Sequence, residues 1–301
     1  MEPMNVTQLR DLLATDVAPV LINVLPEDIF AVGRIPGSVN ACVFEMVFVS
    51  AVEKLVPDKT KPVVVYGAGE GSLDAQVAAG KLSAAGFTQV NALEGGLPAW
   101  EAAGLPVEGE GALPAPQSFD GSYKVDAEAS VIRWTGRNLF NHHNGTLKLS
   151  AGSIEVANNR LLNAKFEIDL QTMACEDLTD SQWNAMLIKH LRDADFFDVD
   201  HYPTGSFVGT SVDAILGSSE GSANYTIKGM LTLRGISKEI EFPALIAMAD
   251  NGRITTQALL ELDRTDFGSH YGSGKFFRFL GKHLVNDLIQ LHLKIHADPA
   301  S

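Results

Sequence analysis

The two cysteines, Cys42 and Cys175, are the side chains best suited to nucleophilic or metal chemistry. They lie far apart in the sequence and outside any CxxC pattern, so neither a disulfide framework nor a zinc–thiolate site is indicated. A lone cysteine is more often a small buried side chain than a reactive thiol. We therefore expect two free thiols, as is usual in a reducing compartment.

The eight histidines form no metal-ligand pattern. His142 and His143 are adjacent, so on a strand they point to opposite faces, and His292 and His296 fall on the polar side of an alternating segment without a carboxylate at ligand spacing. We expect solvated surface histidines and no metal site, with His142 near a ligand head group as the alternative. We do not expect a Ser/His/Asp hydrolase site.

The net charge excludes several classes of partner. With 23 Lys and Arg against 37 Asp and Glu, the formal charge is -14, so nucleic acid and anionic surfaces are poor partners. The longest apolar-rich run, residues 41–52, is shorter than the ~20 residues that a bilayer requires. The N-terminus lacks a basic start followed by an apolar stretch, so no secretory signal is indicated. These features predict a soluble, cytoplasmic protein.

The sequence divides into two halves with different patterns, and any functional site must be built on one of them. The 301 residues suggest two domains, and the proline- and glycine-rich stretch around residues 104–122 is typical of a connector. We place the first domain at residues 1–108, the linker at 109–120 and the second domain at 121–301.

The first half predicts an α/β domain. Short apolar runs at residues 19–25, 61–67 and 89–95 alternate with helix-like segments such as the alanine-rich residues 72–85. Near-continuous apolar strands that alternate with helices indicate a parallel sheet covered on both faces.

The second half predicts an all-β barrel with one inserted helix. Apolar and polar residues alternate strictly at residues 165–170, 225–233, 254–262 and 289–295, which is typical of an antiparallel sheet with one apolar face and, repeated this often, of a closed barrel. Residues 179–192 instead show helical spacing, with Thr179 or Asp180 as the N-cap.

Three separated motifs in residues 5–107 resemble the rhodanese homology domain. They are LINVLPEDIFAVGRIPGSVN, KPVVVYGAGEGS and AAGFTQVNALEGGLPAWEAAGLPV. In that family a cysteine opens the loop after the central strand and an arginine usually follows five residues later, but these positions are Gly67 and Ser72 here. The family's usual acid after the first strand is Asn23, and its usual histidine before IPG is Arg34.

Sulfur transfer requires a thiolate that carries a persulfide, and glycine has no nucleophile. We therefore expect a rhodanese fold without sulfurtransferase activity, serving as an interaction module for a protein partner. The degenerate loop could still bind a small anion through its backbone N–H groups, although Glu70 opposes this. The residues of this loop are Gly67, Ala68, Gly69, Glu70, Gly71 and Ser72.

Residues 121–298 resemble the YceI-like polyisoprenoid-binding family. The similar segments are YKVDAEASVIRWTGRNLF, HLRDADFFDVDHYPTGSF, YTIKGMLTLRGISKEIEFP, LDRTDFG and VNDLIQLHLKIHA. The resemblance implies a lipocalin-like barrel around a long apolar ligand such as a polyisoprenoid, a quinone or a fatty-acyl chain, with no required cofactor.

Strand alternation and the inserted helix supply candidate ligand-binding residues. An apolar inward face suits a chain without hydrogen-bonding groups, but the same residues could instead fill a solid core. The candidates are Trp134, Phe140, Phe166, Ile168, Trp183, Met186, Phe196, Phe197, Phe207, Tyr225, Ile227 and Leu231.

The segment KFFRFLGKH, residues 275–283, combines four basic residues with three phenylalanines. It is either a loop that touches a membrane or a partner transiently, or a core-facing strand with charged ends.

The leading hypothesis is a non-enzymatic lipid carrier with an attached interaction domain. The alternatives are a sulfurtransferase-related or quinone- or lipid-modifying enzyme, and a pair of interaction modules with a filled barrel. The sequence does not decide whether the protein forms a homodimer.

Overall fold

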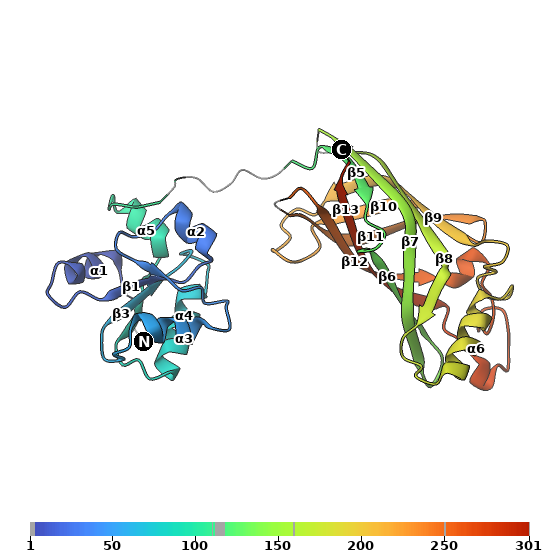
Figure 1. The fold of residues 1–301 in the computed structure, drawn as a ribbon, viewed down its shortest axis with the longest axis horizontal. Coiled ribbons are helices and arrows are strands. Elements are labelled where there is room, and N and C mark those ends of the chain that lie inside the picture. Colours follow the sequence, from blue (N-terminus) through green and yellow to red (C-terminus); the bar gives the residue numbers. More distant parts are fainter. Residues whose placement is uncertain (1–3, 110, 112–117, 159, 250, 301) are drawn as a thin grey trace. The chain divides into compact units, whose positions relative to one another are not determined.

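The structure is a computed structural model, and it describes residues 4–109, 111, 118–158, 160–249 and 251–300. Contacts divide the chain into two units, residues 1–116 and 117–301, which are described separately below (Figure 1). This division falls within the predicted linker, of which residues 110 and 112–117 lie outside the described residues.

The first unit is built on a parallel sheet, as the apolar runs predict. Its strand order is β2-β1-β3-β4, and every neighbouring pair is parallel. The strands are β1 (Val20–Asn23), β2 (Val39–Asn40), β3 (Val63–Tyr66) and β4 (Val90–Ala92). The helices are α1 (Val6–Leu13), α2 (Glu27–Val32), α3 (Phe48–Leu55), α4 (Asp74–Ala84) and α5 (Gly96–Ala102). The predicted α/β class is therefore confirmed.

Alternation along β3 explains why this sheet has helices on both faces. Val63 and Val65 pack with apolar residues of α3 and α4, whereas Val64 and Tyr66 pack with Leu9 of α1 and with Trp100 of α5. All four β3 residues are buried, as expected for a central parallel strand. This strand leads directly into the rhodanese-like loop.

The second unit is a closed antiparallel barrel. Its strands are β5 (Gly121–Val125), β6 (Val131–Arg137), β7 (His142–Ala157), β8 (Arg160–Cys175), β9 (Thr204–Ala214), β10 (Tyr225–Leu233), β11 (Ile236–Met248), β12 (Ile254–Asp263) and β13 (Leu288–Pro299). The β12–β13 pairing closes the ring, and β5 and β6 each pair with both β7 and β13. These two short strands thus share one position, which gives eight positions around the barrel, and the predicted class is confirmed.

One helix, α6 (Ser181–Arg192), interrupts the strands between β8 and β9, as predicted. Asp180 rather than Thr179 is its N-cap, because the Asp180 carboxylate accepts from the N–H groups of Gln182 and Trp183 at 2.9 and 3.1 Å. The last turn carries Lys189, His190 and Arg192.

The segment of residues 275–283 forms turns and a short 3₁₀ helix, η2 (Gly281–His283), so the alternative of a core-facing strand is wrong. The N–H groups of Phe276 and Phe277 both donate to the Ser273 carbonyl, which commits them to a turn instead of a strand ladder. Phe276, Phe277 and Phe279 are exposed.

Candidate ligand cavity and rhodanese-like loop

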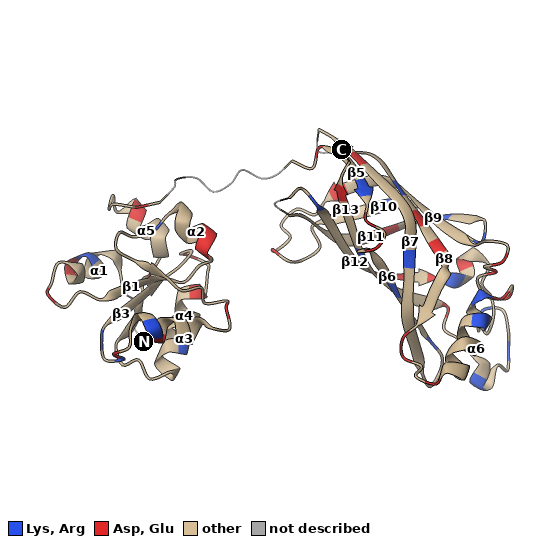
Figure 2. Ribbon diagram, in the orientation of Figure 1, with Lys and Arg blue, Asp and Glu red and all other residues tan. Residues whose placement is uncertain are grey.

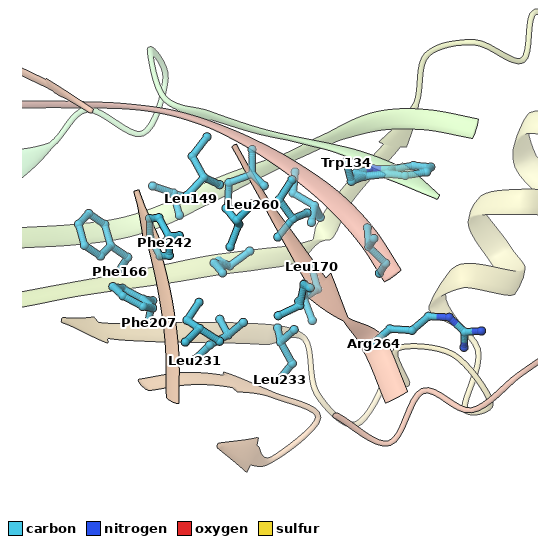
Figure 3. A pocket seen from close by; sticks show the side chains of 18 of the residues that line it. Trp134, Leu149, Phe166, Leu170, Phe207, Leu231, Leu233, Phe242, Leu260 and Arg264 are labelled. Atoms are coloured by element: carbon cyan, nitrogen blue, oxygen red, sulfur yellow. The ribbon is translucent and has the colours of Figure 1, made fainter. Parts of the chain in front are cut away.

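The barrel encloses a cavity of about 500 Å³ (Figure 3). Apolar side chains from every strand from β6 to β13 line it, and Phe119, at the end of the predicted linker, also contributes. This volume lies within the range of ~300–1,000 Å³ that is typical of small-molecule sites.

Period-two alternation creates the apolar wall. On β10, Tyr225, Ile227, Leu231 and Leu233 line the cavity. Their partners across the strand register are inward-facing too, since Ile227 pairs with Phe242 and Leu231 pairs with Phe207.

Gly229 makes room for an aromatic side chain between these positions. A Cβ at residue 229 would lie 2.3 Å from the Phe207 Cζ, so Phe207 occupies the space that a larger residue would fill. The Phe207 ring contacts the rings of Phe166 and Phe242 at centroid distances of 6.2 and 6.0 Å. The aromatic cluster thus lies on the wall because β10 has no side chain there.

Nine of the twelve predicted ligand-binding residues line the cavity, and their role in binding stays a prediction. They are Trp134, Phe166, Ile168, Phe196, Phe197, Phe207, Tyr225, Ile227 and Leu231.

The other three predicted residues lie elsewhere. Phe140 is 77% exposed, because it lies in the turn between β6 and β7 that the Asn138 side chain stabilises. Trp183 and Met186 are 61% and 51% exposed. The face of α6 that lines the cavity instead carries Leu187, His190 and Leu191; Met186 lies to one side of it and Trp183 one turn nearer the helix start.

Polar groups gather at one end of the cavity, which we call the α6 end. Five segments form this end: the end of β6, the start of β7, helix α6, the residues that follow β12 and the residues that precede β13. The ionisable side chains that line it, tyrosines aside, are Arg137, His143, His190, Arg264, Lys282 and His283. Figure 2 shows further basic segments on and beside α6. Among the described lining residues there is no Asp or Glu, so this end is cationic in an acidic chain.

Arg264, which the sequence analysis did not single out, is almost fully buried at the α6 end (Figure 3). Its guanidinium donates to the backbone carbonyls of Ser269, Val285 and Asn286 at 2.6, 3.2 and 3.0 Å. It also lies 5.4 Å from the centre of the Phe196 ring. Burial lowers the pKa of Arg264, while the charge of Asp287 opposes that shift. Its position directly after a strand was visible in the sequence, but nothing there indicated burial.

The histidines differ in part from the prediction of solvated surface residues. His143 and His190 are half-buried and line the cavity. His283 also lines it but is exposed, as is His142. The His143 Nδ1 lies 2.9 Å from the Asp177 Oδ2. Burial alone would raise the pKa of Asp177, but hydrogen bonds from the Asn144 N–H, the His143 ring and the Cys175 thiol hold that pKa at about 2. Within the described residues, no three His, Cys, Asp or Glu side chains lie close enough together to hold a metal ion.

Both cysteines are free thiols. Cys42 is partly buried in the first unit, and Cys175 is buried at the end of β8. Burial raises the pKa of the Cys175 thiol, which disfavours a reactive thiolate.

The rhodanese-like loop is occupied by a side chain of its own. The Asp74 carboxylate, at the start of α4, accepts from the Ala68 N–H at 3.0 Å, the Ser72 hydroxyl at 2.7 Å and the Ala75 N–H at 2.5 Å. A Cβ at Gly67 would lie 2.1 Å from the Asp74 Oδ1. The buried carboxylate thus fills the space where a side chain at position 67 would begin. The sequence analysis did not single out Asp74.

The fold and the cavity define a β-barrel with an apolar interior and an attached α/β domain. The YceI-like domain model matches residues 123–297, and the rhodanese-like domain model matches residues 5–103. The chain belongs to the YceI-like family and carries a rhodanese-like domain at its N-terminal side.

Individual relatives cover parts of the chain. A UPF0312 protein of Pseudomonas putida is 31% identical over 141 residues, which is 45% of this chain and 67% of the relative. Burkholderia cenocepacia BcnA aligns with a TM-score of 0.45 at 21% identity, over 57% of this chain and 98% of its own. A polyisoprenoid-binding domain from Saccharophagus degradans, implicated in plant cell wall breakdown, aligns with a TM-score of 0.43 at 15% identity, over 59% and 98%.

Within the described residues, no helix is both long and apolar enough to cross a membrane.

Proposed function

We propose that the protein is a non-enzymatic carrier that holds one long apolar molecule in its barrel. The observation that carries this proposal is the cavity of about 500 Å³ with its continuous apolar wall. A polyisoprenoid, a quinone tail and a fatty-acyl chain all present the hydrocarbon that such a wall binds.

The energetics favour a chain-like ligand. Burial of apolar carbon contributes ~0.8 kcal/mol per CH₂, so about ten carbons contribute roughly 8 kcal/mol before the costs of ordering and association. Binding of this kind needs no catalytic group.

The test is to purify the full chain without detergent, extract it with organic solvent and identify the extract by mass spectrometry. Delipidated protein is then titrated with farnesol and followed by calorimetry. We expect a co-purified lipid or saturable farnesol binding at one molecule per chain. A lipid-free protein that also fails to bind farnesol would contradict the proposal.

For the first domain we propose a role as an interaction module without sulfur-transfer activity. Gly67 offers no nucleophile, and the Asp74 carboxylate fills the adjacent space. Exposed Phe44, Met46 and Val47 give the surface an apolar segment that a protein partner could cover. A thiosulfate-to-cyanide assay tests the enzymatic alternative: we expect no turnover above buffer, and turnover that the Cys42→Ser variant loses would overturn this assignment.

A further inference from the structure

The outer surface at the α6 end of the barrel carries large apolar side chains that are exposed. They come from three segments, which are the turn between β6 and β7, helix α6, and residues 276–279 before β13. Among the described residues of this unit, every exposed Phe, Tyr or Trp side chain except Tyr202 belongs to this set. We call the set the rim, and its members are Phe140, Trp183, Met186, Phe276, Phe277 and Phe279.

Contacts hold the three segments of the rim together. Asn138, in the turn before β7, forms an antiparallel bridge with Val285, which precedes β13. The His190 ring of α6 lies 4.4 Å from the ring of Tyr271, between centroids, so the segment before β13 also packs on the helix. Figure 1 shows α6 at the end of the barrel away from the C-terminus. The rim is therefore one surface, although its residues are far apart in the sequence.

The rim surrounds a mouth of the cavity. Lys282 is exposed and also lines the cavity, so the cavity reaches the surface here. Asn138, Leu187 and Lys282 line the cavity, and each lies at most three residues from a member of the rim. No rim residue is among those that line it. The rim side chains thus point away from the cavity, around its opening.

The surface beside the rim is basic in an acidic chain. Residues 268–286 include Lys275, Arg278 and Lys282 and contain no Asp or Glu. Lys275 pairs with Asp263 and Asp287, but Arg278 and Lys282 have no ion pair among the described residues. Salt screens charges beyond ~8 Å at physiological ionic strength, so the net charge of the whole chain does not decide what this surface attracts.

Phe279 shows that the fold itself does not use these rings. The side chain is fully exposed, and its backbone has a φ of 61°, in the left-handed region. This conformation is unfavourable for a bulky residue, and the exposed ring gains no packing in return. Such strained positions cluster where a protein contacts something else.

We propose that the rim, with Arg278 and Lys282, is a docking surface for an anionic lipid bilayer. Exposed aromatic rings mixed with basic side chains are typical of segments that lie in a membrane interface. A bilayer is favoured over a protein partner because the rim surrounds the mouth of an apolar cavity, and long hydrocarbon molecules reside in bilayers instead of water. The inference goes beyond the proposed carrier function, since it states from where the cavity is loaded.

Vesicle flotation of the full chain tests the docking. The vesicles contain phosphatidylcholine alone, or phosphatidylcholine with an equal amount of phosphatidylglycerol. We expect at least about ten-fold tighter binding to the anionic vesicles, because each basic residue near such a surface contributes about five-fold in affinity. Added salt should weaken this binding, because it screens the attraction.

Two variants locate the surface. Phe279→Asn should weaken vesicle binding roughly ten-fold through the loss of buried apolar area, and it should not harm the fold because Asn accepts a positive φ. Arg278→Gln should weaken it roughly five-fold. Neither residue lines the cavity, so both variants should bind farnesol without vesicles as the wild type does.

Each variant has a matched control. Leu216→Asn removes an exposed apolar side chain from the loop after β9, at the opposite end of the barrel. Lys294→Gln removes a charge that is exposed on β13 and has no ion pair among the described residues. Both controls should bind vesicles like the wild type.

Trp183 provides a direct reporter. It is 61% exposed, whereas Trp100 and Trp134 are buried. Anionic vesicles should therefore shift the tryptophan emission of the wild type to shorter wavelength. Trp183→Phe should still bind the vesicles but lose the shift.

The outcomes separate docking from the carrier function. No flotation with either vesicle, equal binding to both, or equal binding by Phe279→Asn and Leu216→Asn would overturn the docking surface, while farnesol binding would still support the carrier. A dimer in solution that Phe279→Asn dissociates would show that a second copy covers the rim, and would overturn the proposal as well. Docking without any farnesol or extracted lipid would contradict the carrier function alone.

Discussion

The barrel contains an open cavity, whereas the space in the rhodanese-like loop is filled by a side chain of the same domain. In the barrel, apolar side chains that alternate inward surround an open cavity of about 500 Å³. In the loop, the Asp74 carboxylate occupies the space beside Gly67 and accepts the N–H groups that a bound anion would use. Resemblance to a family therefore predicts where a pocket lies, while single side chains decide whether it is open.

The size of the two spaces explains the difference. An anion site in a loop is small, so one carboxylate fills it and satisfies its donors. The barrel cavity has walls on every strand from β6 to β13, so its volume depends on many side chains.

The largest expected effect comes from filling the barrel. Ile227→Trp projects an indole into the cavity, and we expect it to weaken binding of the best ligand by roughly a hundred-fold or more, as calorimetry would measure. Met230→Trp is the control on the same strand, because Met230 is partly exposed and does not line the cavity. Equal loss in both variants would mean that the wall residues do not hold the ligand.

A cysteine at residue 67 of the loop should destabilise the first domain. In Gly67→Cys the new Cβ meets the Asp74 carboxylate, and we expect a loss of about 2 kcal/mol in the free energy of unfolding by urea denaturation. The double variant with Asp74→Ala should lose less than the sum of the two single changes. Gly80→Cys, on α4 with open space around its Cβ, should be neutral or slightly stabilising.

Removing the carboxylate alone should open the loop. Asp74→Ala leaves the Ala68 and Ala75 N–H groups without their acceptor, at a cost of about 1–2 kcal/mol in the free energy of unfolding. Millimolar sulfate or thiosulfate should raise the melting temperature of this variant more than that of the wild type. Glu70→Ala, which removes an exposed acid of the same loop, is the control, and an equal response in all three proteins would contradict the idea that Asp74 stands in for an anion.

The smallest effect concerns the α6 end of the cavity. The pKa of Asp177 is lowered from its usual 3.8 to about 2, so its interactions stabilise the fold above about pH 4 and lose this contribution as the pH falls toward 2. Asp177→Asn should therefore be less stable than the wild type at neutral pH, and the difference should shrink between pH 4 and pH 2. A difference that is constant with pH would show that the charge of Asp177 does not matter.

Periodicity made most of the barrel predictable. The alternation at residues 225–233 marks β10 at its observed bounds, and it placed Tyr225, Ile227 and Leu231 on the inward face because side chains alternate with a period of two.

The α6 end and the loop were less predictable, for physical reasons. Arg264, Lys282 and His283 lie in non-strand segments, where no period indicates direction. For α6, helical spacing identified the apolar stripe but did not indicate that Trp183 lies beyond the cavity wall. The role of Asp74 depends on a carboxylate folding back onto its own loop, which spacing does not reveal.

The position of Asp74 also restricts how this domain can change by single substitutions. A thiol at residue 67 collides with the Asp74 carboxylate while that residue is present. Loss of Asp74 first leaves the Ala68 and Ala75 N–H groups without their acceptor. Either single substitution therefore gives a less stable protein. A loop with a cysteine at residue 67 and no acid at residue 74 is reached only through a destabilised variant, whichever change comes first.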